Sequence, residues 1–327
     1  MNNPTNLQAS AADHSALVDH SAVAPSRAVP TAPMVQMVGV TKTYKHFQLH
    51  PVDLTLHAGT VMGLVGPNGA GKSTIMRIMM GLVNPASGSV EILGQGMSSN
   101  SALLKREIGY FSDDMRLYKA ETLGWHMQLV RSLYPNWDQA YAQSLLTRFG
   151  LIDQQPIKGL SHGQRVKAML LLLLARRPKL LILDEPTNGL DPVAKQEVLA
   201  ELMEVMTDET RAIIYSSHQT QDVEQISDWL TFIDRGRVIA SDNRDDFLDQ
   251  WRRIKLRAPQ SWNWPAIRGL RQESQLQSFR ALTVAGFNAE VTAALTDTGA
   301  EVESVEPMTL EEIFVEVVLR GRERDTA

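Results

Sequence analysis

The pattern of hydrophobic and polar positions becomes regular at about Met34. From there, short apolar or alternating runs recur between Gly, Pro and Asn residues, which is typical of β-strands. The runs on the N-terminal side cover residues 35–40, 49–56, 61–65 and 90–93. Two later runs, 180–183 and 212–215, show no polar alternation. For 180–183 that pattern predicts a strand buried within a parallel sheet, and 212–215 is expected to be a further strand.

Helical periodicity separates these strand runs. Residues 138–149 carry apolar positions at helical spacing, with Asp138 as the N-cap and Gly150 as the stop. A second helix should begin after Ser161 and run to Arg177. It is apolar on most sides, so it should lie centrally. Helices that alternate with strands in this way predict an α/β fold.

The two ends of the chain differ from this central part. Residues 1–33 are rich in Ala, Ser, Asn and Pro, which predicts a disordered N-terminal tail. The α/β domain should span 34–250, with a hairpin turn at Gly236. Residues 251–327 should form a small C-terminal accessory domain of α+β type.

Two features support that accessory domain. Basic residues at 253, 255 and 257 alternate with apolar ones, which favours the wet face of a strand over a nucleic-acid patch. Trp262 and Trp264 should pack beneath it. Thr309 and Glu312 form a capping box that starts a helix. Its apolar stripe is expected to be domain core and comprises Leu310, Ile313, Phe314, Val317 and Val318.

Composition bounds the classes of protein that remain. With 327 residues, 43% of them hydrophobic, the chain can bury a full core. The net charge of −5 gives no general basic field, so nucleic acid is not an expected partner. The sequence contains no cysteine, which excludes disulfides. The longest apolar run has eight residues, so no transmembrane helix is expected. A secretory signal is not expected either, because the first positive charge is Arg27 and no compact apolar segment precedes it.

A glycine-rich loop follows the run 61–65 directly and leads into a predicted helix. It reads Gly-Pro-Asn-Gly-Ala-Gly-Lys-Ser, the pattern that cradles the phosphates of a nucleoside triphosphate. Lys72 supplies a charge for the outer phosphates and Ser73 a hydroxyl for Mg²⁺. An ordinary turn is the alternative, which the strand-to-helix context disfavours. The expected ligand residues are Gly66, Pro67, Asn68, Gly69, Ala70, Gly71, Lys72, Ser73 and Thr74.

Two carboxylates, Asp184 and Glu185, end the apolar run that starts at Leu180. Ligands of open α/β sheets lie at the carboxyl ends of the strands, so these acids should face the same ligand as the glycine loop. Asp184 is placed to hold Mg²⁺, and Glu185 to polarise the attacking water as a general base. The alternative is a helix cap or an ion pair.

Five motifs in this order and spacing resemble those of the ATP-binding-cassette (ABC) ATPases. They are the glycine loop 66–73, Leu160–Gln164, Leu180–Glu185, Gly189–Pro192, and His218 after the run 212–215. The resemblance covers residues 34 to about 250. It implies a P-loop NTPase core with a mixed sheet flanked by helices, and a helical subdomain at about 114–160.

The resemblance also implies roles for individual residues. His218 would contact the γ-phosphate and hold Glu185 in line. Tyr44 would stack on adenine, with ordinary packing as the alternative. The family's signature motif, which contacts the ATP bound by a second subunit, would consist here of Ser161, His162, Gly163 and Gln164. Asp191 would lie across the contact between the two subunits. His162 replaces the commoner glycine of the family.

One position departs further from the family pattern. Relatives often end the segment that resembles Ile108–Asp113 with glutamine, where this chain has Asp113. A carboxylate only accepts hydrogen bonds and adds negative charge. We therefore expect Asp113 to join Ser73 and Asp184 at the metal.

The implied function is that of an ATPase subunit, with ATP and Mg²⁺ as cofactors, that drives a separate membrane permease. A segment like Leu310–Phe314 is typical of ABC-2-type exporters, so export is expected. The partners would be a second ATPase subunit, identical or different, and the permease, which would hold the chain on the cytoplasmic face of the inner or plasma membrane. The alternatives are a soluble ABC ATPase acting on nucleic acid or ribosomes, and a non-hydrolysing regulatory protein.

Overall fold

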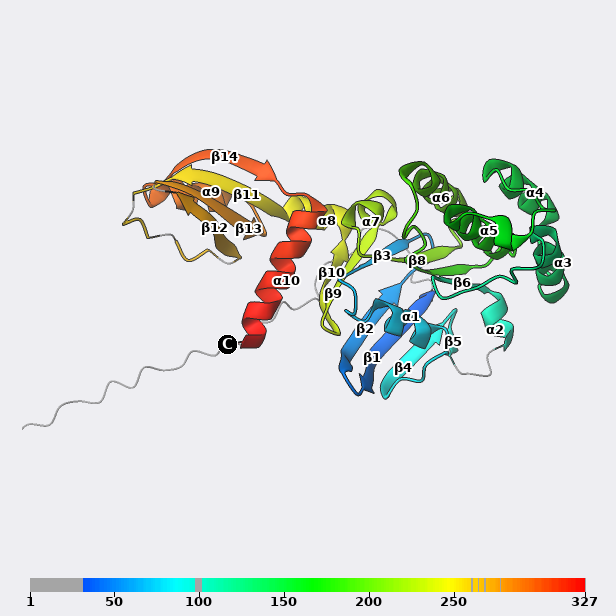
Figure 1. Cartoon of the computed structure of the whole chain (residues 1–327). Coiled ribbons are helices and arrows are strands. Elements are labelled where there is room, and N and C mark those ends of the chain that lie inside the picture. Colours follow the sequence, from blue (N-terminus) through cyan, green and yellow to red (C-terminus); the bar gives the residue numbers. More distant parts are fainter. Residues whose placement is uncertain are drawn as a thin grey trace, which may run out of the picture. The chain divides into compact units, whose positions relative to one another are not determined.

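The structure is a computed structural model that describes residues 32–97, 102–259, 261–263, 265–267, 269–276 and 278–326. Nearly all of the predicted tail, and Trp264, lie outside the described residues. Within the described ranges the strands form three sheets (Figure 1). In this part of the chain, every helix is too short or too polar to cross a lipid bilayer.

The central sheet has the strand order β10-β9-β3-β8-β7-β6. Its strands are β3 (Val61–Val65), β6 (Ile108–Ser112), β7 (Leu180–Asp184), β8 (Ala212–Ser217), β9 (Trp229–Asp234) and β10 (Arg237–Asn243). The first five of these pair in parallel, while β10 runs antiparallel to β9. Strands β3, β7 and β8 are buried at every position, which confirms the prediction of a buried strand for β7.

A smaller antiparallel sheet packs over the helix that follows the glycine loop. Its order is β2-β1-β4-β5, from β1 (Val35–Tyr44), β2 (Phe47–Leu56), β4 (Ser87–Ile92) and β5 (Gln95–Gly96). Helix α1 (Lys72–Met79) buries Ile75 and Met76 between this sheet and the central one, in a cluster that also holds Val35 and Ile182. The phosphate-loop helix is therefore held from both sides.

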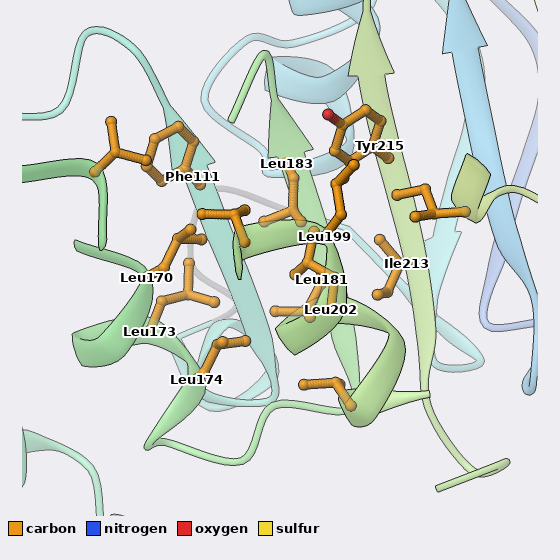
Figure 2. Packing of buried hydrophobic residues seen from close by; sticks show 14 of the residues in the cluster. Phe111, Leu170, Leu173, Leu174, Leu181, Leu183, Leu199, Leu202, Ile213 and Tyr215 are labelled. Carbon is orange, nitrogen blue, oxygen red and sulfur yellow. The ribbon is translucent and has the colours of Figure 1, made fainter. Parts of the chain in front are cut away.

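Helices cover the opposite face of the central sheet. They are α3 (Leu123–Leu133), α4 (Gln139–Arg148), the 3₁₀ turn η1 (Ile157–Gly159), α5 (His162–Leu174), α6 (Pro192–Val205), α7 (Thr220–Ile226) and α8 (Arg244–Gln250). The short helix α2 (Ala102–Arg106) instead buries Leu104 in the cluster on the α1 side. Figure 2 shows leucines of α5 and α6 packed against Phe111, Leu183 and Tyr215 of the sheet. The predicted central position of α5 is confirmed.

The N-cap predicted for α4 is confirmed, whereas the C-terminal end predicted for α5 is wrong. The Asp138 carboxylate accepts the Tyr141 amide at 2.9 Å and caps α4, as predicted. The predicted end of α5 at Arg177 is wrong, because the helix stops at Leu174. Arg177 has a φ of 52°, a left-handed conformation that ends a helix.

The C-terminal residues form the third sheet, with order β12-β13-β11-β14 and all pairs antiparallel. The elements are β11 (Trp251–Arg257), β12 (Leu270–Leu276), β13 (Phe279–Ala285), α9 (Ala289–Asp297), β14 (Glu301–Pro307) and α10 (Leu310–Thr326). Ile254 and Leu256 are buried, and the basic residues that alternate with them make ion pairs with glutamates; these are Arg253, Lys255 and Arg257. The predicted wet face is confirmed.

The final helix packs differently from the prediction. Its capping box is present, since Glu312 N–H donates to Thr309 Oγ1 at 3.3 Å and Thr309 N–H to Glu312 Oε2 at 2.9 Å. However, Leu310 and Ile313 belong to the main core cluster of the cassette and not to the cluster under the C-terminal sheet. Phe314 of the same stripe packs against the ring of Phe232 in β9. The apolar stripe of α10 therefore contacts the cassette and not the C-terminal sheet.

Candidate nucleotide site

The parallel strands bring the predicted site residues to one edge of the central sheet. Gly66, Asp113, Glu185 and His218 each lie just beyond the carboxyl end of β3, β6, β7 or β8. Ser112, Asp184 and Ser216 stand in register across three of these strands. Motifs more than a hundred residues apart therefore converge where open α/β sheets bind ligands.

The glycine loop has backbone conformations that other residues avoid. Gly69 and Gly71 have φ values of 81° and 116°. A Cβ on Gly66 would lie 2.3 Å from the Ile233 carbonyl oxygen, so the backbone approaches β9 closely. Gly71 caps α1 with no side-chain hydrogen bond. The first N–H groups of α1 therefore face the loop and can receive an anion.

Lys72 is buried between the loop and the acidic strand. It is 5% exposed, and its Nζ donates to the Gly66 carbonyl at 2.6 Å. Nζ also lies 3.2 Å from Glu185 Oε1. A buried ammonium requires such partners. The structure thus places the loop's one cation directly against the predicted general base.

Glu185 is held by contacts on both of its oxygens. Oε2 lies 2.7 Å from His218 Nδ1, while Oε1 is buried and has only the charge contact with Lys72, with no aligned hydrogen bond from any described residue. The backbone φ is 53°, and the Glu185 amide donates to Ser216 Oγ at 3.1 Å. A non-glycine residue in this conformation is strained, which is common at functional sites.

Asp184 lies deeper, at 6% exposure, and its Oδ1 accepts the Ser216 hydroxyl at 2.7 Å. Carboxylate and hydroxyl oxygens are suitable Mg²⁺ donors, so Asp184 and Ser73 fit that ion. The described residues contain no group of three acidic, His or Cys side chains close enough to hold a metal alone. A Mg²⁺ here would take its other ligands from phosphate and water, as this ion usually does.

A buried polar network under Glu185 was not predicted. The Thr187 hydroxyl donates to Asp222 Oδ2 at 2.8 Å and receives the Tyr215 hydroxyl at 2.6 Å. Lys195 Nζ pairs with the same aspartate at 2.8 Å. Burial, the largest cause, raises the pKa of Tyr215, which therefore stays a donor. Thr187 lies in the segment between β7 and α6, while Lys195, Asp222 and Tyr215 come from α6, α7 and β8, and no local motif connects them.

A pocket of about 520 Å³ opens at this edge. Tyr44 lines it at 43% exposure. His46, Phe47 and Glu185 also line it, and neither His46 nor Phe47 was predicted as a site residue. The remaining lining residues are Pro67, Asn68, Gly69, Ala70, Gly71, Lys72, Ser73 and Thr74.

The signature residues lie outside that pocket, on exposed helix starts. The Ser161 hydroxyl accepts the Gln164 amide at 3.2 Å, and the Gln164 side chain returns to the Ser161 amide at 2.9 Å. His162 Nε2 lies 3.0 Å from the Asn188 carbonyl oxygen. Asp191 caps α6, and the backbone hydrogen bond from Ala194 lowers its pKa.

Comparison with known proteins gives the family. A family model described as ABC transporter matches residues 49–188. The lantibiotic transport ATP-binding protein SrtF of Streptococcus pyogenes is 38% identical over 215 residues, which are 65% of this chain and 92% of SrtF. The ABC transporter ATP-binding protein YtrB of Bacillus subtilis is 26% identical over 269 residues, 82% of this chain and 91% of YtrB.

Solved structures agree with the sequence relatives. An ATP-binding subunit of an ABC transporter superposes with a TM-score of 0.61 at 27% identity, covering 66% of this chain and 92% of that one. A nucleotide-free cassette from an ABC transporter, at 20% identity and a TM-score of 0.57, covers 64% and 91% and shows the same fold. The predicted fold class and family are confirmed. The chain belongs to the ABC transporter family, as an ATP-binding subunit that hydrolyses ATP in transport.

Proposed function

We propose that this chain binds Mg²⁺-ATP between two ATPase subunits and drives a separate membrane permease in export. The observation that carries the proposal is Glu185, which faces both Lys72 and His218 beside the pocket of the glycine loop. A carboxylate fixed by two cationic or donor groups, next to an anion cradle, suits the activation of water beside a phosphate.

In this proposal the residues 66–74 bind the phosphates and Tyr44 stacks on adenine. Lys72 exchanges its contact with Glu185 for one with a phosphate oxygen, because the two negative groups compete for one ammonium. Glu185 is then free to accept the proton of the attacking water. His218 keeps the carboxylate oriented through the contact at Oε2.

Ser73, Asp184 and Asp113 would hold the Mg²⁺. When bound, the ion neutralises charge that develops on the phosphate oxygens. Asp113 is exposed and follows Ser112, the strand partner of Asp184. It therefore lies on the edge where the other two ligands lie, which supports its role.

The second half of the site would come from another subunit. Each chain has one glycine loop and one signature, and Ser161 lies outside the pocket at an exposed helix start. A two-fold dimer, identical or of two related ATPases, would put the helix end at Ser161 and Asp191 onto the partner's nucleotide. ATP would then favour the closed dimer, and hydrolysis would release it.

An apolar groove of about 270 Å³ suits the permease. It runs between β6, α3 and α5 and is lined by Tyr110, Phe111, Met115, Val130, Leu133, Met169, Leu172 and Leu173, among others. Leu133 is 57% exposed and Met115 is 42% exposed. Met115 is two residues from Asp113, so the groove adjoins the nucleotide edge. We assign it to an apolar segment of the permease. The relative SrtF is named a lantibiotic transport protein, which is consistent with a role in transport.

The test is co-purification from detergent-solubilised membranes. A multi-span protein that co-purifies with the chain supports transport, whereas bound RNA or DNA supports a soluble ATPase acting on nucleic acid. Leu133→Glu should abolish that co-purification while ATP binding stays unchanged, because Leu133 lies outside the nucleotide pocket. Leu82→Glu is the matched control, since Leu82 is 59% exposed but does not line the groove.

A further inference from the structure

The β9–β10 hairpin contacts the phosphate loop from outside the nucleotide pocket. Gly236 N–H donates to the Ala70 carbonyl at 2.9 Å, and the Ile233 carbonyl fills the space where Gly66 lacks a side chain. Gly236 also accepts the His50 amide at 2.8 Å. The loop's backbone therefore depends on where this hairpin lies.

The turn of the hairpin leaves little freedom. Arg235 and Gly236 have φ values of 47° and 75°, the conformation of a two-residue turn with both positions left-handed. A Cβ on Gly236 would lie 1.9 Å from the Gln48 carbonyl oxygen. Arginine is not favoured in such a turn, so other contacts must keep it in place.

One of those contacts comes from the last helix of the chain. Asp234 begins the turn, and its side chain is 7% exposed. Arg322 of α10 binds both of its oxygens, with Nε 2.9 Å from Oδ2 and Nη2 3.0 Å from Oδ1. A two-point pair of this kind fixes direction as well as charge.

Helix α10 is anchored well before Arg322. Phe314 packs edge to face on Phe232, one residue before Ile233, with ring centres 5.3 Å apart. Leu310 and Ile313 are fully buried in the cassette core. On its other side, Glu312 pairs with Arg253 of the C-terminal sheet at 2.7 Å. Helix α10 thus connects that sheet to the hairpin.

We propose that Arg322 is a positioning residue for ATP binding, which acts through Asp234 and Gly236 on the Ala70 carbonyl of the phosphate loop. Without Arg322 the Asp234 carboxylate is buried and loses its two-point partner, so the turn shifts and the loop no longer presents its N–H groups in one arrangement. The C-terminal unit would thereby set nucleotide affinity. The inference rests on the proposed role of residues 66–74 as the ATP site.

The test uses Arg322→Gln in the full-length protein, with Mg²⁺ and a fluorescent ATP analogue. We expect the Kd, and the KM for ATP, to rise about threefold to tenfold, as for the loss of a charged hydrogen-bonded pair. The kcat should stay within about twofold, because the partners of Glu185 are Lys72, His218 and Ser216, which lie outside the hairpin. Asp234→Asn should act alike, and the double variant should be no weaker than the weaker single variant.

The control is Arg257→Gln, which removes an exposed ion pair with Glu303 in the C-terminal sheet and should leave the Kd unchanged. Arg322→Lys should recover part of the affinity, and it serves as the test if Arg322→Gln does not fold. A lowered melting temperature with an unchanged Kd would overturn the inference. Lys72→Ala separates the two proposals: if it leaves ATP binding intact, the assigned ATP site itself is wrong.

Discussion

The two halves of the candidate site differ in how this chain completes them. On the phosphate-loop side, Lys72 is 5% exposed and already has a carboxylate partner. On the signature side, Ser161 and Asp191 are exposed, and each caps its own helix. The first half is therefore built by the parallel sheet, and the second is a surface whose polar groups are satisfied locally.

This difference has an energetic consequence. In the proposed mechanism, a phosphate that binds at the loop would replace Glu185 as the partner of the buried Lys72 ammonium, so that one ion pair would be exchanged for another. A phosphate that arrives at the signature must compete with the cap that Ser161 provides to Gln164, which typically contributes about 1 kcal/mol. Binding ATP to one chain should therefore precede closure on a second chain.

The largest expected effect is a loss of hydrolysis rate from a substitution in the phosphate-loop half. Glu185→Gln keeps the size of the side chain and removes the proton acceptor, so the hydrolysis rate should fall by about 10²–10⁴. ATP binding should persist, because the negative charge beside the phosphates is lost. Phosphate release gives the rate, and size measurement with ATP should show a trapped dimer.

Glu91→Gln is the matched control for that experiment. Glu91 is exposed on β4, away from the pocket, so its loss should change neither rate nor binding. Turnover at the wild-type rate in Glu185→Gln would mean that another group activates the water, and the contact with His218 would then be only an ion pair.

The next largest effect is expected from a substitution that changes the signature half alone. Ser161→Asp keeps a good N-cap, so stability should change by less than about 0.5 kcal/mol. The new carboxylate would repel a phosphate held by a second chain, and ATPase activity should fall at least about tenfold. Equilibrium binding of ATP to the isolated chain should be unaffected.

Asn288→Asp makes the same kind of change at the cap of α9, far from the signature in sequence and absent from the pocket. It should leave activity unchanged. If Ser161→Asp also left activity unchanged, Ser161 would be a helix cap only, and the two-chain site would have to be abandoned.

The same contrast explains what the sequence could predict. The glycine loop, the acids at the end of β7 and the cap at Asp138 depend on neighbours in sequence, so the local pattern was enough to predict them. The network of Thr187, Asp222 and Lys195 depends on three elements that only the tertiary fold brings together. No spacing rule predicts such contacts.

The C-terminal helix illustrates the limit further. Its capping box was readable because Thr309 and Glu312 are three residues apart. The element that packs against α10 could not be predicted, because an apolar stripe indicates that one face of a helix is buried but not what covers that face. The pair of Asp234 and Arg322, 88 residues apart, was missed for the same reason.

A smaller effect sharpens the metal side of the comparison. Asp113→Gln restores the residue that relatives often carry, and we expect the Mg²⁺ concentration for half-maximal rate to rise about twofold to fivefold, the range for an exposed carboxylate. Asp114→Asn is the control, since that neighbour pairs with Arg77 at 2.6 Å. An unchanged rate together with an unchanged Mg²⁺ dependence would remove Asp113 from the metal site.

The smallest effect concerns the link between the two halves. The His162 ring lies 3.0 Å from the carbonyl oxygen of Asn188, three residues after Glu185, so it connects the start of α5 to the segment that follows β7. His162→Gly should cost about 0.5–1.5 kcal/mol of folding stability for the lost hydrogen bond. The ATPase rate should stay within about twofold, because the helix cap comes from Ser161 and not from the ring. Thermal unfolding and steady-state hydrolysis measure the two quantities separately. A tenfold loss of rate with little loss of stability would instead show that the ring acts on the partner's nucleotide, and His162 would then belong to the chemistry of the interface.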